Sequence, residues 1–78
     1  MMNENIYNGM EFDNYQMCQI RRGLEEGLNV DIYAKPEFNC SQMGQIRLGI
    51  RKGLDVAIYA KPEYNYERMR EIRESLTK

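Results

Sequence analysis

The fold is decided by residues 38–63, FNCSQMGQIRLGIRKGLDVAIYAKPE, because the 26 residues before them have nearly the same sequence. Residues 12–37 read FDNYQMCQIRRGLEEGLNVDIYAKPE, and 16 of the 26 aligned positions are identical without a gap. A shorter copy starts at Tyr64, and residues 1–11 align with the end of a copy. Such self-similarity is typical of repeat proteins. The sequence therefore predicts one domain over residues 1–78, with full repeats at 12–37 and 38–63 and partial repeats at 1–11 and 64–78.

Each copy is predicted to begin with a long helix. A helix-capping residue (Asp13, Asn39 or Asn65) follows an aromatic residue, and its side-chain oxygen can accept a hydrogen bond from a first-turn amide. Gly27 and Gly53 stand where a left-handed residue would end the first two helices. Apolar residues recur three and four positions apart, which places them on one helical face. These are Met17, Ile20 and Leu24, then Met43, Ile46 and Ile50, then Met69, Ile72 and Leu76.

A shorter element follows each of the first two helices. It begins at a capping residue and stops at a proline, because the residue before a proline avoids the helical region. Its apolar residues are spaced i, i+3 and i+4, which favours a helix of one to two turns. The alternation of Leu28, Val30 and Ile32 leaves a strand in a parallel sheet as the alternative. The two elements lie between Asn29 and Pro36 and between Asp55 and Pro62.

A small residue recurs inside the long helix, at Gly23, Gly49 and Ser75. A glycine in mid-helix costs up to about 1 kcal/mol relative to alanine, so its recurrence predicts close packing of the short element on the long helix. One unit cannot bury its apolar face alone, whereas stacked units share a continuous core. We therefore predict an all-α fold, a short helical-repeat (αα solenoid-like) array of about 2.5–3 repeats with alternating long and short helices.

Composition excludes several classes of function. The chain has 78 residues, a net charge of −1 and no histidine. A near-neutral charge argues against a general nucleic-acid or membrane-surface binder, and without histidine the commonest general base and transition-metal ligand is absent. Cys18 and Cys40 are expected to be free thiols, since a metal site would need two further soft ligands. We expect no enzymatic activity, no cofactor and no metal.

The pattern of the chain does not predict membrane insertion or export. No apolar run approaches the roughly 20 residues that span a bilayer. Residues 1–5 are polar and acidic, unlike a signal peptide. We therefore expect a cytoplasmic protein.

The second copy resembles a short tandem repeat found in proteins of Clostridia and related gut Firmicutes, including proteins of mobile elements. The pattern that carries the resemblance is QMxxIRxGIxxGLDVxIYAxP over residues 42–62. The resemblance extends over nearly the whole chain. It implies an all-helical repeat fold and a bacterial or phage source, and it implies no particular activity.

The junction between the long and short elements also fits the turn of a helix-turn-helix. Gly49, Gly53 and Leu54 have the small, glycine and apolar residues at the required spacing. The following proline leaves about six residues for the second helix, which is too short for a normal recognition helix. DNA or RNA binding is therefore an alternative function and not the favoured one.

Arg21, Arg47 and Arg73 recur at 26-residue spacing and would form a ridge in a stacked array. The ridge could bind phosphates or an acidic partner. The favoured interpretation is that each arginine pairs with an acid of a neighbouring unit, such as Glu37 or Glu63, or caps backbone carbonyls, because the acids recur as regularly.

Tyr33 and Tyr59 recur in the same way, and Tyr7 falls on their register. Such a series could form a strip that binds a partner. The favoured interpretation is that the rings fill the space between repeats.

Positions that differ between copies are freer to carry function. Residues 1–40 carry a net charge of −4 and residues 41–78 a net charge of +3, so we expect a dipolar molecule that could associate head to tail. Leu48 replaces a charged residue and is a candidate exposed apolar contact. Arg22, Glu25 and Glu26 of the first copy become Leu48, Arg51 and Lys52 in the second, and of these Arg22, Leu48, Arg51 and Lys52 are the candidate partner-binding residues.

These observations favour a non-enzymatic module that binds a macromolecule, with a protein as the expected partner. In the bacterial or phage setting that the resemblance implies, a small stoichiometric inhibitor of a bacterial defence protein is the specific hypothesis. The alternatives are a DNA- or RNA-binding adaptor and a structural unit that self-assembles head to tail or by two-fold association.

Overall fold

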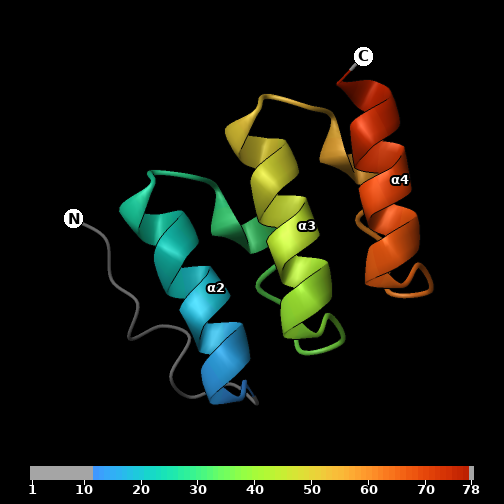
Figure 1. Cartoon of the computed structure of the whole chain (residues 1–78). Coiled ribbons are helices and arrows are strands. Elements are labelled where there is room, and N and C mark those ends of the chain that lie inside the picture. Colours follow the sequence, from blue (N-terminus) through green and yellow to red (C-terminus); the bar gives the residue numbers. More distant parts are fainter. Residues whose placement is uncertain (1–11, 78) are drawn as a thin grey trace.

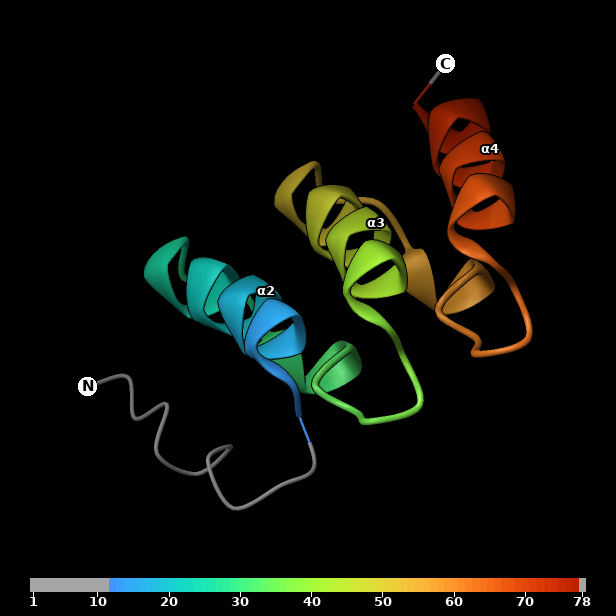
Figure 2. The ribbon, with the colours of Figure 1, turned by 60° about the horizontal axis from the view of Figure 1, so that its bottom comes forward.

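The computed structural model describes residues 12–77 as an all-helical fold. The helix α3 packs between α2 and α4, and two short 3-10 turns, η1 and η2, lie on one side of this row (Figures 1 and 2). The predicted all-α class is confirmed, and the described part of the chain contains no strand. In chain order the elements are α2 (Asn14–Glu25), η1 (Val30–Ile32), α3 (Cys40–Arg51), η2 (Val56–Ile58) and α4 (Tyr66–Leu76). The partial repeat predicted for residues 1–11 lies outside the described residues.

The two short elements are each a single 3-10 turn, at the lower end of the predicted one to two turns. In η1 the amides of Tyr33 and Ala34 donate to the carbonyl of Val30, at 3.0 and 2.8 Å. The turn does not continue into a longer helix before the proline. The strand alternative for these segments is wrong.

The predicted capping residues begin all three α-helices. The side chains of Asp13, Asn39 and Asn65 each accept a hydrogen bond of 2.8 Å from the backbone amide three residues on. In α2 and α3 that third residue is a glutamine, and its side chain accepts from the backbone amide of the cap in return. The side chain of Arg68 stands at this position in α4 and has no oxygen acceptor, so only the cap's own bond is made.

Glycine ends α2 and α3 as predicted. Gly27 and Gly53 have φ of +74° and +76°, in the left-handed region that glycine adopts without a side-chain clash. The amide of the next residue, Leu28 or Leu54, donates 2.9 Å back to the carbonyl of Gly23 or Gly49. The chain therefore reverses sharply and carries η1 and η2 back against the helix just completed.

The core lies between the helix row and the two short turns. Tyr33 and Tyr59 are fully buried, and the space they need exists because Gly23 and Gly49 have no side chain. A Cβ atom at Gly49 would overlap the Tyr59 hydroxyl and lie 2.6 Å from Val56 Cγ1. The prediction that a glycine allows close packing of the short element is thus confirmed for both positions. The buried apolar residues are Ile20, Val30, Tyr33, Ala34, Phe38, Met43, Ile46, Val56, Tyr59 and Met69.

Two buried glutamines hold each helix to the loop that leads into the next. The side-chain amide of Gln42 donates to the carbonyls of Pro62 and Tyr64, at 3.1 and 2.6 Å. Gln16 makes the corresponding bonds to Pro36 and Phe38, at 3.3 and 2.6 Å. Each glutamine therefore caps its own helix and fixes the start of the following one.

Candidate functional site

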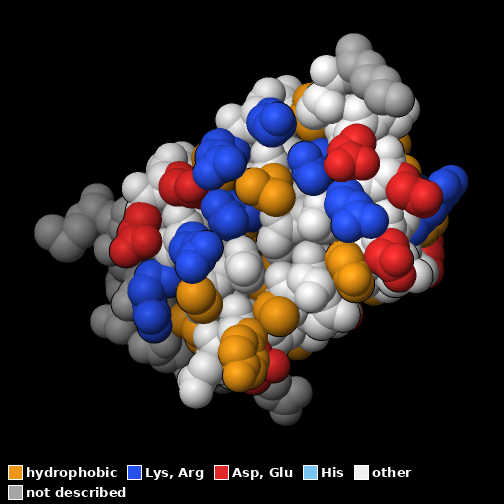
Figure 3. Space-filling view, viewed as in Figure 1, with side chains coloured by type: hydrophobic (Ala, Val, Ile, Leu, Met, Phe, Trp, Pro, Cys, Tyr) orange, Lys and Arg blue, Asp and Glu red, His pale blue; other side chains and the backbone are white. Residues whose placement is uncertain are grey.

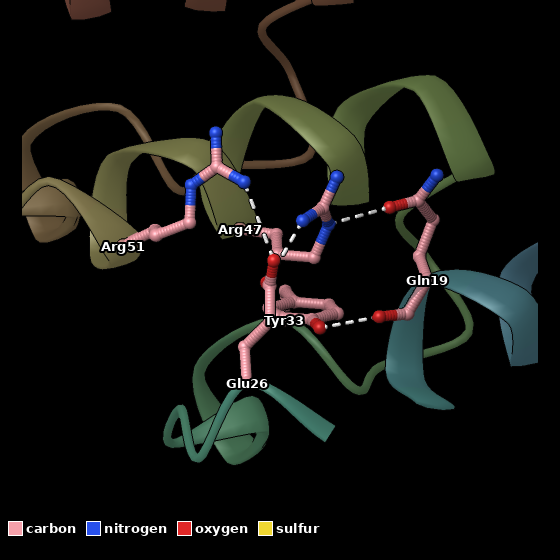
Figure 4. Close-up of polar contacts among 5 residues, drawn as sticks. All are labelled: Gln19, Glu26, Tyr33, Arg47 and Arg51. Carbon is pink, nitrogen blue, oxygen red and sulfur yellow. Dashed lines mark hydrogen bonds and ion pairs between the residues drawn. The ribbon is translucent and has the colours of Figure 1, made fainter. Parts of the chain in front are cut away.

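A chain of polar contacts joins α2 to α3 (Figure 4). Arg47 of α3 donates from Nε to the side-chain oxygen of Gln19 at 3.0 Å and from a terminal nitrogen to Glu26 at 2.9 Å. Arg51 reaches the other oxygen of Glu26 at 3.3 Å. Arg47 is only 8% exposed. The expectation that the repeated arginine pairs with a neighbouring acid therefore holds for Arg47, although the acid is Glu26.

The carboxylate of Glu26 is stabilised by these contacts. The hydrogen bond from Arg47 holds the pKa of Glu26 below its ordinary value, and Arg51 acts in the same direction. Desolvation opposes the shift only in part. The carboxylate is therefore a bridge between two guanidinium groups, one buried and one half-exposed.

The interface between α3 and α4 has the same arrangement of a glutamine, an arginine and a helix-capping residue, which we call the frame, but its capping residue is not an acid. Arg73 donates from Nε to the side chain of Gln45 at 2.9 Å, as Arg47 does to Gln19. Lys52 stands 26 residues after Glu26, at the same capping position of its helix. Within residues 12–77, no ion pair involves Lys52 or Arg73. The second interface therefore has a lysine at the position where the first has the carboxylate of Glu26, together with an arginine that matches Arg47.

The tyrosine strip does not belong to a surface. The rings of Tyr33 and Tyr59 have no exposed area, and their hydroxyls donate to the carbonyls of Gln19 and Gln45. Burial raises the pKa of Tyr59 to about 12, with Arg73 acting weakly in the opposite direction. Their candidacy as partner-binding residues is corrected, because they fit the alternative in which they fill the core.

Three further candidates, Arg22, Leu48 and Arg51, lie on the side of the helix row away from η1 and η2, which we call the outer face. With 3.6 residues per turn, its positions fall within about 60° of the direction opposite the buried Ile20 and Ile46. None of them is buried. They are Asn14, Tyr15, Cys18, Arg22 and Glu25 in α2, Cys40, Ser41, Gly44, Leu48 and Arg51 in α3, and Tyr66, Glu67, Arg70 and Glu74 in α4.

Charge is unevenly spread over the outer face. Lys and Arg side chains form a band across it, and acidic side chains lie to both sides of the band (Figure 3). Leu48 is half-buried in the C-terminal half of the central helix α3, where the sequence predicts an exposed apolar residue. Tyr15, which the sequence reasoning did not single out, is the most exposed large apolar residue that the structure describes, at 73%. Arg21 lies exposed on α2 and Cys18 is a free exposed thiol.

The differences between the two full copies fall mainly on this face. Ten of the 26 positions differ, and six of these lie on the outer side of the helix or at its C-terminal cap. Away from this face the exposed residues 35–37 and 61–63 are identical, whereas three other exposed pairs differ, namely Asp13 and Asn39, Asn29 and Asp55, and Asp31 and Ala57. The six differing pairs are Asn14 and Cys40, Tyr15 and Ser41, Cys18 and Gly44, Arg22 and Leu48, Glu25 and Arg51, and Glu26 and Lys52.

The far side of α4 differs from the side by which α3 holds η2. In α3 the contacts with the following segment come from Gln42, Gln45 and Gly49. The corresponding residues of α4 are all different and polar. Arg68 and Glu71 form an ion pair at 3.5 Å across this side, and Ser75 brings a Cβ where a tyrosine hydroxyl would sit. A further unit of the same kind could not pack here in the same way.

Membrane, metal and family comparisons add little. No helix among residues 12–77 is long and apolar enough to cross a membrane. The described residues contain no group of three or more metal-ligating side chains. No family model, curated protein or solved structure matches the chain.

Proposed function

We propose that this chain is a short helical-repeat array that binds another protein through its outer face and has no catalytic role. The observation that supports this is where the two copies differ. The internal positions are constrained, because the same contacts recur 26 residues apart in both. All five outer-face positions that the two copies share differ between them, whereas the exposed residues 35–37 and 61–63, away from this face, are identical. An individual surface on a uniform scaffold is what repeat proteins use to recognise a partner.

The chemistry of the outer face suits a protein partner. Leu48 lies half-buried on the central helix, with Arg22 and Glu74 at the corresponding positions of the flanking helices. Protein interfaces commonly place an apolar residue at the centre and charged residues around it. A partner would therefore bury Leu48 and pair with the charges at the rim.

The test is capture from a bacterial lysate with three tagged proteins: the wild type, Leu48→Asp and Lys35→Glu. Leu48→Asp places a charge on the central helix of the outer face, and Lys35→Glu makes a charge change away from this face. We expect one protein to be retained in near-equal molar amount by the wild type and Lys35→Glu, and to be lost with Leu48→Asp. Retention by all three, or by none of them, would contradict the proposal.

The specific hypothesis of a stoichiometric inhibitor concerns the identity of that partner. A bacterial defence protein in the cytoplasm is the candidate, on the strength of the sequence resemblance. Purified partner should then lose activity in a titration that ends at one chain per binding site. Unchanged activity at saturation would leave a binding module without inhibition.

The two alternatives have less support. With η1 and η2 only three residues long, the helix-turn-helix interpretation lacks a recognition helix. Head-to-tail assembly would need the far side of α4 to accept a unit, and Ser75 and the Arg68–Glu71 pair stand in its way. A protein partner on the outer face meets neither obstacle.

A further inference from the structure

The contact between α2 and α3 supplies a template for a second site. Glu26 caps α2 with φ −84° and ψ −1°, and from there its carboxylate bridges two arginines of the next helix. The distances are 2.9 Å to Arg47 and 3.3 Å to Arg51. Gln19 holds Arg47 in place through Nε, which leaves the terminal nitrogens to bind the carboxylate.

The contact between α3 and α4 has the same frame. Lys52 caps α3 with φ −87° and ψ 0°, so its side chain leaves the backbone in the same direction as that of Glu26. Gln45 accepts from Arg73 Nε at 2.9 Å, within 0.1 Å of the matching bond in the first interface. By analogy with the template, we expect the terminal nitrogens of Arg73 to face the side chain of Lys52, in the place where the template has a carboxylate.

We propose that Lys52 and Arg73 together bind an acidic side chain of the partner protein, at the place that Glu26 occupies in the first interface. The inference rests on the proposed function, because the carboxylate comes from a protein bound to the outer face. Lys52 follows Leu48 by four residues on α3, so the two lie next to each other on the helix surface. A partner that covers Leu48 would therefore bring an Asp or Glu within reach of the pair.

A carboxylate is favoured over a phosphate because the same frame already holds a carboxylate in this molecule. A guanidinium presents parallel N–H donors that match the two oxygens of a carboxylate. Adding a carboxylate here also removes the repulsion between two neighbouring cations. The site is therefore specific in chemistry, although small.

The experiment is an NMR titration of the full chain with a hexaglutamate peptide, followed at the arginine Nε–Hε signals. We expect the Arg73 signal to shift in a saturable way and the Arg47 signal, already paired with Glu26, to stay in place. In Lys52→Glu the new acid occupies the site, and the affinity should fall at least tenfold. Lys35→Glu makes the same change in net charge elsewhere and should lower the affinity less than threefold.

The proposal is overturned if Arg73 does not shift, or if the two charge variants weaken binding equally. It is also overturned if a single-stranded hexanucleotide shifts Arg73 at lower concentration than the peptide, since the site would then be one for phosphate. If the peptide has no effect but a protein is still captured in a Leu48-dependent way, the carboxylate site is contradicted and the proposed function stands. If the peptide shifts Arg73 but no protein is captured in a Leu48-dependent way, the carboxylate site stands and the proposed function is contradicted.

Discussion

The phenol oxygen of Tyr59 lies 2.7 Å from the backbone carbonyl oxygen of Gln45, across a stretch of helix that Gly49 leaves bare. Tyr33 makes the same contact with Gln19 at 2.6 Å. A carbonyl oxygen has two lone pairs, so the hydroxyl can bind it without displacing the helical amide. This contact links a long helix to the short turn after it, and it requires a residue without a side chain beneath the ring.

Gly49→Ala is the most direct test of that link. The added Cβ would overlap the Tyr59 hydroxyl and crowd Val56, so we expect the free energy of unfolding to fall by about 1–3 kcal/mol. Gly44→Ala is the matched control on the same helix, because its Cβ would meet nothing closer than the Gln19 side chain at 3.7 Å. There alanine should stabilise the protein by about 0.4–1 kcal/mol. Urea unfolding followed by circular dichroism measures both, and equal effects would contradict the packing argument.

Alkaline pH should weaken the same contact. The pKa of Tyr59 is raised to about 12 by burial, whereas tyrosine in an unfolded chain ionises near about 10. The folded state therefore holds the proton more tightly, and its contribution to stability is complete below about pH 10 and is lost as the pH rises through about 12. We expect the free energy of unfolding of the wild type to fall over this pH range. The free energy of unfolding of Tyr59→Phe should fall less steeply.

Tyr59→Phe should also be less stable than the wild type at neutral pH. Tyr59→Phe loses the bond to the Gln45 carbonyl, which should lower stability by about 0.5–1.5 kcal/mol. Tyr15→Phe, at a position that is 73% exposed, should change neither the neutral stability nor the slope with pH. Unfolding in urea at pH 7 and from pH 9 to 12 gives both quantities. A Tyr59→Phe protein with the same alkaline slope as the wild type would show that another group is responsible.

The sequence predicts the features that depend on local geometry. The capping residues, the left-handed Gly27 and Gly53, and the bare helix at Gly23 and Gly49 follow from spacing alone, because each acts within one copy or on the next element. Contacts that cross between helices could not be predicted in this way. Comparison of the copies marks Glu26 only as a position that differs and does not identify it as the partner of Arg47, because that pairing depends on the distance between two helices.

The buried glutamines are a second example. Gln16 and Gln42 each stand three residues after a helix cap. That spacing accounts only for the hydrogen bond that the side-chain oxygen accepts from the backbone amide of the cap. Their nitrogen atoms bind carbonyls 20 and 22 residues further along the chain, and no short-range pattern marks such a pair. Their identity in both copies was the available signal, and it did not separate a structural role from a functional one.

Gln42→Glu tests the second role of this residue. A glutamate keeps the oxygen that accepts from the Asn39 amide at 2.9 Å, and it replaces the nitrogen that donates to Pro62 and Tyr64 with a second acceptor. Two carbonyls then face a carboxylate, and we expect a loss of about 1–3 kcal/mol. Gln45→Glu is the control, because it adds the same charge on α3 with an oxygen still facing Arg73. Chemical unfolding at pH 7 compares them, and similar stabilities would mean that the clamp contributes little.

Acid should open the first interface between the helices. The pKa of Glu26 is lowered by its hydrogen bond from Arg47, so the carboxylate stabilises the folded state above the pKa of the unfolded chain. That contribution is lost as the pH falls through the lower, folded-state pKa. We expect Glu26→Gln to be less stable than the wild type at pH 7 and to lose less stability on acidification to pH 2. Parallel stability curves for the two proteins over this range would contradict the assignment.

Lys52→Glu should supply to the second interface the acid that the first one has. The new carboxylate would stand beside Arg73 in the frame that places Glu26 beside Arg47. A partly exposed ion pair of this kind contributes about 0.2–1 kcal/mol, so we expect a small gain in the free energy of unfolding. The gain should disappear in Arg73→Gln, and a double-mutant cycle isolates the coupling between the two positions. Zero coupling would mean that the two side chains are not neighbours. A coupling energy close to that of Glu26 and Arg47 would show that both interfaces have the same geometry and differ only in the charge of the capping residue.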